Sequence, residues 1–218
     1  MNGPAKAQFS ANVDEKLRIR KLLQEITNRI HAAQNIKQIL VDLKDGILNL
    51  FDAHSITIYI VDKIRNEIYS LFLTGTQLKE IRVPISNKSI AGFVANTGKV
   101  VNISDAYNQA ELQLIDAELS FDQNWDKRSG FRTRQILAAP IYNNDQLHGV
   151  IQILNKKIGE GNFSEEEIGL TLEIAEVLGI AFYNQQRFTR RKTRFDYLVS
   201  HDLIKEEELD KSLEESRE

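Results

Sequence analysis

The chain has 218 residues, of which 42% are hydrophobic and 27% are charged, and its formal net charge at pH 7 is −3. This length can bury the core of one ordinary domain with extensions, and because acidic and basic residues are interspersed we expect no nucleic-acid partner. The absence of cysteine excludes disulfide bonds, a thiolate nucleophile and cysteine-ligated zinc.

The N-terminal segment carries no targeting pattern and is followed by a helical one. Residues 1–12 lack the features of a secretory signal, and we expect them to be flexible. Because no later apolar run is long enough to cross a bilayer, we expect a cytoplasmic protein without membrane insertion. Asn12 and Glu15 have the spacing of a capping box, which predicts a helix over 13–34. Helical spacing resumes over 36–50, which indicates two consecutive helices or one bent helix.

Alternating apolar residues and turn signals predict strands in the middle of the chain. The predicted strands cover residues 55–61, 68–73, 80–85, 100–103, 134–142 and 147–155. Polar turns at 62–66 and 143–146 join two pairs of them as hairpins, so the sheet should be mainly antiparallel. The apolar stretch 90–95 predicts a short helix that Gly98 ends as a left-handed cap.

The remaining segments are a long connection and a C-terminal helical region. Residues 106–129 are polar and irregular, and they should contain a helix or cover a site. Ser164 and Glu167 have capping-box spacing and predict the start of a helix that reaches about residue 190. We interpret the basic residues over 187–194 as the solvated end of that helix, rather than as a site for anionic lipid. The acidic stretch 205–218 predicts one more helix.

Patterns of catalytic or metal-binding residues are missing from the sequence. The four histidines lie on different expected elements, without metal-ligand spacing. They are His31, His54, His148 and His201. A phosphate loop is excluded because five residues separate Gly92 from Gly98 where four are needed. We therefore expect no catalytic residues, no metal site and no hydrolysis of cyclic nucleotides or nucleoside triphosphates.

Three ordered blocks of the sequence, 89–107, 130–137 and 149–156, resemble a GAF domain, with the greatest likeness to the tandem GAF domains of cyclic-nucleotide phosphodiesterases. The resemblance covers residues 36 to about 187. It implies an α+β fold in which a GAF-like central antiparallel sheet of about six strands has long N- and C-terminal helices on one face. A ligand pocket would lie under short helices on the other face.

The resemblance also implies how the chain is divided. A sensor domain would cover 35–190, after the N-terminal helix 13–34. Residues 191–218 would be a linker and the truncated start of a following domain. Within them, 195–209 resembles the opening of the N-terminal domain of type II secretion and type IV pilus assembly ATPases, which implies that such an ATPase is the downstream output domain.

Seven residues are implied as ligand-binding by their position in the resemblance. In the relatives the pocket holds a cyclic nucleotide, so Phe72 would stack on the base and the backbone of Ile90 and Ala91 would meet a phosphate at a helix start. The full set is Thr57, Phe72, Ile90, Ala91, Asp126, Thr133 and Gln152.

Some positions depart from the relatives. Leu73 stands near an acidic position that reads guanine, Asp122 stands where an aromatic residue is expected, and Gln152 replaces a glutamate. These differences argue against guanine recognition. The relatives' signature is present as Lys156 with Glu167 in an acidic position, so Glu167 either pairs with Lys156 or serves only to cap the following helix.

The leading hypothesis is a non-catalytic regulatory GAF domain that binds a small molecule, with a cyclic nucleotide as the candidate, and signals to a downstream output domain. An enzymatic role like that of GAF-type methionine sulfoxide reductases would need cysteines, which the chain lacks. The alternative is a dimerisation or protein-docking module with a vestigial pocket.

We also expect a parallel homodimer through the helices at 17–30 and 168–188, because both carry more apolar residues than one sheet face can bury. The two apolar stripes of the C-terminal helix are Ile168, Leu172, Ala175 and Phe182, and Leu170, Ile174, Val177, Ala181 and Phe188. Charged substitutions at Leu178 and Phe182 should dissociate the dimer if these side chains face the partner. Outright unfolding would instead place them in the intrachain core. The alternative is that the two helices only cover each other.

Overall fold

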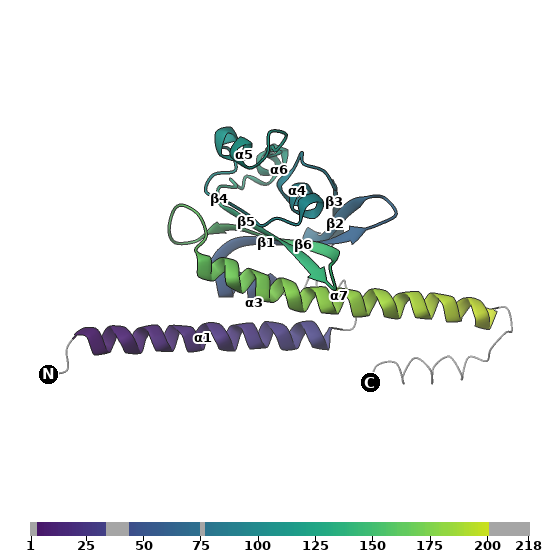
Figure 1. Ribbon diagram of the computed structural model, residues 1–218, viewed down its shortest axis with the longest axis horizontal. Coiled ribbons are helices and arrows are strands. Elements are labelled where there is room, and N and C mark those ends of the chain that lie inside the picture. The colour runs from purple at the N-terminus through teal and green to yellow at the C-terminus, as the bar shows by residue number, and fades with distance from the viewer. Residues whose placement is uncertain (1–3, 34–43, 75–76, 201–218) are drawn as a thin grey trace.

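An antiparallel six-stranded sheet separates the helices into two layers (Figure 1). The computed structural model describes residues 4–33, 44–74 and 77–200. The sheet order is β3-β2-β1-β6-β5-β4. The strands are β1 (Ala53–Asp62), β2 (Glu67–Thr74), β3 (Gln77–Pro84), β4 (Val101–Ile103), β5 (Ile136–Asn143) and β6 (Gln146–Lys156). The α+β class and the six-stranded antiparallel sheet expected from the sequence are confirmed.

One face of the sheet carries the two long helices and one short helix, and the other face carries three short helices (Figure 1). The long-helix layer contains α1 (Pro4–Ala32), α3 (Lys44–Phe51) and α7 (Glu165–Ser200). The short-helix layer contains α4 (Ile90–Thr97), α5 (Gln109–Ile115) and α6 (Asn124–Ser129). Helices α1 and α7 contact each other and run in the same direction. Within the described ranges, none of the helices combines the length and apolar character that spanning a membrane requires.

Helix α1 begins earlier than the sequence pattern predicts. It starts at Pro4, so the expected flexible segment is helical from there, and Asn12 and Glu15 lie inside the helix rather than at its cap. Proline fits the first turn of a helix, and the alanine, lysine and glutamine residues that follow are good helix formers. The part of the expected second helix that precedes Lys44 lies outside the described residues.

Helix α7 ends later than predicted. It continues past residue 190 to Ser200, so the basic residues over 187–194 lie inside the helix and not at its solvated end. The segment contains no proline or glycine that would end it. The helix expected over 205–218 lies outside the described residues.

The local turn signals are confirmed. Gly98 ends α4 in the left-handed conformation, with φ of 69°, and its N–H donates to the carbonyl of Val94 at 2.9 Å. Asn144 and Asp145 have φ of 48° and 58°, as a two-residue hairpin turn between β5 and β6 requires. The long connection over 106–129 contains two helices, α5 and α6.

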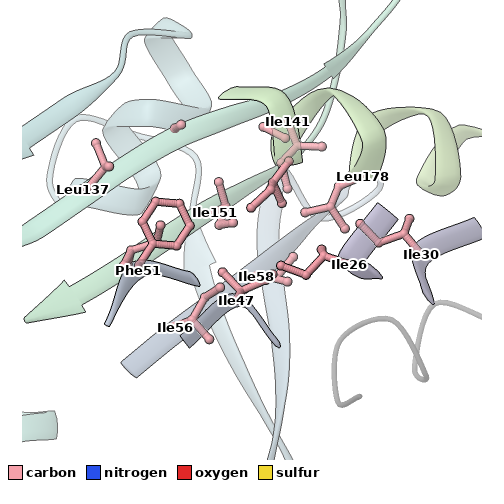
Figure 2. Packing of buried hydrophobic residues seen from close by; sticks show 14 of the residues in the cluster. Ile26, Ile30, Ile47, Phe51, Ile56, Ile58, Leu137, Ile141, Ile151 and Leu178 are labelled. Carbon is pink, nitrogen blue, oxygen red and sulfur yellow. The ribbon is translucent and has the colours of Figure 1, made fainter. Parts of the chain in front are cut away.

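Strand alternation gives the sheet a core on each face. On β1, Ile56, Ile58 and Ile60 pack in the long-helix layer, which Figure 2 shows from close by. Tyr59 lies between them in sequence and packs in the short-helix layer, together with Val150 of β6. Because successive side chains of a strand point to opposite faces, each central strand contributes to both cores.

The buried face of α7 differs from the stripes that the sequence suggested. Leu178 and Phe182 are 0% exposed, which places both in the intrachain core. Ile174 of one predicted stripe and Ala175 of the other are both buried, at 0% and 2% exposed, whereas Leu172, which shares a stripe with Ala175, is 42% exposed. Positions 174, 175, 178 and 182 follow three- and four-residue spacing, so they form one continuous helix face.

We expect Phe182→Ala to lower the free energy of unfolding by about 3–5 kcal/mol, because the substitution opens a cavity between α7 and the sheet. Ile158→Ala is the control: Ile158 is 81% exposed, so its truncation should change the free energy of unfolding by at most about 0.5 kcal/mol. Urea denaturation followed by circular dichroism measures both. Equal losses in the two variants would contradict the packing described for α7.

Candidate functional site

Buried polar side chains gather on the sheet face under the short-helix layer. Thr57 of β1 lies directly opposite Gln152 of β6 in the antiparallel register, so these two predicted site residues come together. Gln152 is only 8% exposed. Tyr59 shares the face of Thr57, two residues along β1. Ser70 of β2 lies on this face too, because its neighbour Tyr69 packs in the long-helix layer.

Tyr59 and Ser70 belong to this candidate site, and the sequence analysis did not name them. They are 7% and 4% exposed. Burial raises the pKa of Tyr59 to about 12, so its hydroxyl remains protonated at neutral pH and can donate a hydrogen bond. Period-2 alternation along β1 was the signal for Tyr59, since the strand that carries Thr57 toward the site carries Tyr59 there as well.

The polar ends of these buried residues have no partner within the described parts of the chain. Tyr59, Ser70 and Gln152 form no side-chain hydrogen bond there. Each of these unpaired oxygen and nitrogen atoms keeps some accessible surface. They therefore face accessible space rather than a sealed apolar core. A buried polar group without a hydrogen bond costs free energy, which a polar ligand would recover.

The start of α4 packs over the same sheet. The Ser89 hydroxyl oxygen caps the helix by accepting from the N–H of Gly92 at 3.2 Å. The N–H groups of Ile90 and Ala91 belong to the first helical turn, where no intrahelical acceptor exists. Both residues are 4% exposed. This helix start is therefore a position at which partial positive charge lies inside the short-helix layer.

Residues 105–133, which we call the lid, are tied to the start of α4. Ser120 forms a parallel bridge with Ser89, and its hydroxyl donates to the carbonyl of Lys88 at 2.8 Å. The side chain of Asn87 donates to Asp116 at 2.9 Å. These contacts support the expectation that the long connection covers a site, because they hold it against the helix that packs on the polar sheet face.

Asp126 joins the two ends of the lid. Its carboxylate accepts from the Thr133 hydroxyl at 2.8 Å, from the Thr133 N–H at 2.6 Å and from the Tyr107 hydroxyl at 3.0 Å. The guanidinium of Arg132 lies 4.3 Å from the centre of the Tyr107 ring. Burial and the hydrogen bond to Asp126 raise the pKa of Tyr107. The carboxylate of Asp126 thus has partners within the chain.

The predicted site residues therefore form two groups and two separate positions. Thr57 and Gln152 are paired on the sheet, and Asp126 and Thr133 are bonded in the lid. Phe72 lies on β2, in register with a residue of β3. Ile90 and Ala91 lie at the remaining position, which is the start of α4.

Glu167 performs both roles that the sequence left open. Its carboxylate accepts from the N–H of Ser164 at 2.6 Å, while the Ser164 hydroxyl oxygen accepts from the N–H of Glu167 at 3.2 Å, which completes a capping box. The same carboxylate lies 3.8 Å from Nζ of Lys156. Lys156 also donates to the carbonyl of Asn162 at 3.0 Å. These contacts tie the end of β6 to the start of α7.

The interior of the short-helix layer carries little charge. Asp126 is the only carboxylate among the buried polar residues that the structure describes. The described ranges contain no group of three or more histidine, cysteine, aspartate and glutamate residues that could hold a metal ion. The chemistry that this face offers is hydrogen bonding by neutral groups, next to the partial positive charge of a helix start.

Comparison with known proteins gives a family match and several relatives. The family model described as GAF domain matches residues 19–182. The chain is 26% identical over 207 residues to the probable 3′,5′-cyclic phosphodiesterase pde-5 of Caenorhabditis elegans, covering 88% of this chain and 27% of that protein. It is 28% identical over 188 residues to the dual 3′,5′-cyclic-AMP and -GMP phosphodiesterase 11A of Takifugu rubripes, covering 81% and 19%.

The chain thus spans only 27% and 19% of the lengths of these two curated relatives. Among solved structures, the GAF domain from a phosphoenolpyruvate-protein phosphotransferase of Coxiella burnetii matches with a TM-score of 0.63 and 19% identity. The match covers 78% of this chain and 96% of that one. At this identity the likeness shows a shared fold.

We expect Asp126→Ala to loosen the lid, because it leaves the N–H and hydroxyl of Thr133 and the hydroxyl of Tyr107 without their acceptor. The free energy of unfolding should fall by about 2–4 kcal/mol, and amide exchange over the lid should accelerate. Glu118→Ala, which removes an exposed carboxylate of the same lid, is the control. Hydrogen exchange measured by mass spectrometry checks both, and unchanged protection in Asp126→Ala would refute this role.

Proposed function

The chain belongs to the GAF domain family, whose members are regulatory ligand-binding domains, and we propose that it binds a small molecule between its sheet and its short-helix layer. The observation that carries this proposal is the set of buried polar groups on one sheet face, Tyr59, Ser70 and Gln152, which have no side-chain partner among the described residues. A ligand with polar edges would satisfy them, and the lid would exclude water from it.

A cyclic nucleotide is the proposed ligand. Two relatives are named as phosphodiesterases of 3′,5′-cyclic nucleotides, and this class of ligand combines a neutral base with one anionic phosphate. The neutral pair of Thr57 and Gln152 suits the base edge, and the backbone of Ile90 and Ala91 suits the phosphate. Phe72 would stack on the base. Because a neutral amide stands at position 152, we propose no strict requirement for guanine.

Asp126 and Thr133 contribute to binding mainly by shaping the lid in this proposal. The Asp126 carboxylate already accepts three hydrogen bonds from Thr133 and Tyr107. An additional direct contact with the ligand would have to share those oxygens. Loss of the cluster should therefore weaken binding through a less ordered cover over the site.

We propose that the domain is a sensor and not an enzyme. GAF domains are in general non-catalytic regulatory domains. The enzymatic GAF-type methionine sulfoxide reductases depend on cysteines, and this sequence has none. The buried polar groups can orient a ligand, but they include no nucleophile paired with a base.

Isothermal titration with cyclic AMP, cyclic GMP and cyclic di-GMP tests the proposed ligand class. We expect at least one cyclic nucleotide to bind, and Gln152→Ala to weaken that binding about 3- to 10-fold because one hydrogen bond is lost. Gln146→Ala is the matched control, since Gln146 is exposed on the same strand. Three flat titrations, together with no small molecule released from denatured protein in mass spectrometry, would favour the docking module over the sensor.

We propose a homodimer through the long-helix layer. Leu172, Ile180 and Tyr183 of α7 are 42%, 41% and 36% exposed, and Leu17 of α1 is 53% exposed. A groove of about 370 Å³ lies between the two helices and is lined by Ile19, Arg20, Leu23, Glu166, Gly169, Leu170 and Glu173. A second copy is the occupant that suits this surface, because a twofold axis lets one patch cover the same patch on its partner.

We expect the purified chain to sediment as a dimer at micromolar concentration, and the double variant Leu172→Asp, Ile180→Asp to sediment as a folded monomer. Two buried carboxylates would make the interface unfavourable without reaching the intrachain core. Ile158→Asp places the same charge on an exposed loop residue outside the helices and should remain dimeric. A native chain that is monomeric at this concentration would contradict the proposal.

The output of the sensor is proposed to leave through α7. This helix extends past the sheet to Ser200, within the segment whose sequence resembles the start of secretion and pilus assembly ATPases. We propose that such a motor ATPase follows in the full-length protein. Paired α7 helices that shift against each other would then reorient the ATPase.

A further inference from the structure

Tyr142, the next-to-last residue of β5, contacts helices on both faces of the sheet. Its backbone carbonyl packs directly on Gly179 of α7, where a Cβ atom would overlap the carbonyl oxygen and lie 2.7 Å from the carbonyl carbon. Its hydroxyl packs on Gly98, the residue that ends α4, and a Cβ atom would overlap there as well. One residue thus lies between the short-helix layer and the longest helix of the structure.

A β-bulge creates this arrangement. The pairing of β5 with β6 shifts from Ile141 opposite Gly149 to Tyr142 opposite Leu147, so His148 is the extra residue. The imidazole of His148 is 1% exposed and lies edge-on to the Tyr183 ring of α7, with ring centres 6.0 Å apart. Both strands of the hairpin therefore contact α7 at the same end of the sheet.

Tyr142 is 39% exposed, but the tip of its ring and its backbone carbonyl are each in close contact with a helix. Gly98 is held in the left-handed conformation, and its N–H is bonded to Val94, so the last turn of α4 is fixed against the hydroxyl. Gly179 brings the backbone of α7 against the backbone of β5 with no side chain between them. The buried backbone contact at Gly179 is stiff, so a shift of α7 has to be accommodated by β5 and by the tyrosine that it carries.

We propose that Tyr142 transmits movement between α4 and α7 and thereby links the proposed ligand site to the proposed output helix. The inference rests on the proposed function in one respect, which is that ligand binding is what moves α4. The mechanical link itself requires no ligand. It can therefore be tested on the free protein, and a failure to bind any cyclic nucleotide would leave this test unaffected.

The test perturbs α7 and measures the response at α4. Gly179→Ala adds a methyl group that collides with the Tyr142 carbonyl, whereas Asn184→Ala changes an exposed residue of the same helix. Hydrogen exchange of the full chain, measured by mass spectrometry, reports on the amides of α4. We expect Gly179→Ala to accelerate exchange in the last turn of α4 about 3- to 10-fold, and Asn184→Ala to leave it unchanged.

A second variant identifies Tyr142 as the link. In a Tyr142→Ala background the ring no longer reaches Gly98, so adding Gly179→Ala should produce no further acceleration in α4, although α7 itself should still respond. A response of α4 that persists in this background would overturn the proposal, as would the absence of any response to Gly179→Ala alone.

A perturbation from the other side decides the question if Gly179→Ala fails to fold. Gly98→Ala adds a methyl group that overlaps the Tyr142 hydroxyl. We expect it to accelerate exchange in the middle of α7 in the native background and to leave α7 unchanged in the Tyr142→Ala background, which has lost the ring. No response of α7 in the native background, or a response that persists without the ring, would overturn the proposal. Gln146→Ala, an exposed change in the same hairpin, controls for general loosening.

Discussion

The structure depends on burying both faces of its central strands. On β1 and β6 the residues that point one way, including Ile58 and Ile151, meet the long helices, and those that point the other way, including Tyr59 and Val150, meet the short ones. A sheet that is apolar on both faces needs cover on both. The long helices give one face an aliphatic core, whereas the short helices leave room for Gln152 and its buried polar neighbours.

The parts of the fold that sequence predicted well are those fixed by local chemistry. Alternation and turn residues predicted all six strands to within a few residues, and Gly98 marked the end of α4 because glycine adopts φ of 69° without steric cost. Helix ends were predicted less well. Helix α1 starts at Pro4, ahead of the capping-box spacing of Asn12 and Glu15, and α7 runs on through a basic segment that looks like a terminus, since helix formation is cooperative once started.

The candidate site was predictable only where it follows strand periodicity or family position. Thr57 and Gln152 lie opposite each other, which depends on the register of β1 and β6, strands separated by most of the domain. The bonds of Asp126 to Tyr107 and Thr133 could not be foreseen, because they depend on how two short helices fold over the sheet. Packing across the chain therefore gives the Asp126 carboxylate partners within the lid, and its contact with a ligand stays a prediction.

The glycine contact in the middle of α7 has a mechanical consequence. Where Gly179 lies on the β5 carbonyl, the helix is as close to the sheet as backbones allow. An α-helix rises about 1.5 Å per residue, so the arm from Gly179 to Ser200 is about 32 Å long. If α7 pivots at Gly179, a tilt of the helix by about 5° displaces Ser200 by about 3 Å. A change in the tilt of α7 at this contact therefore displaces Ser200 more than any residue of the helix nearer to the sheet.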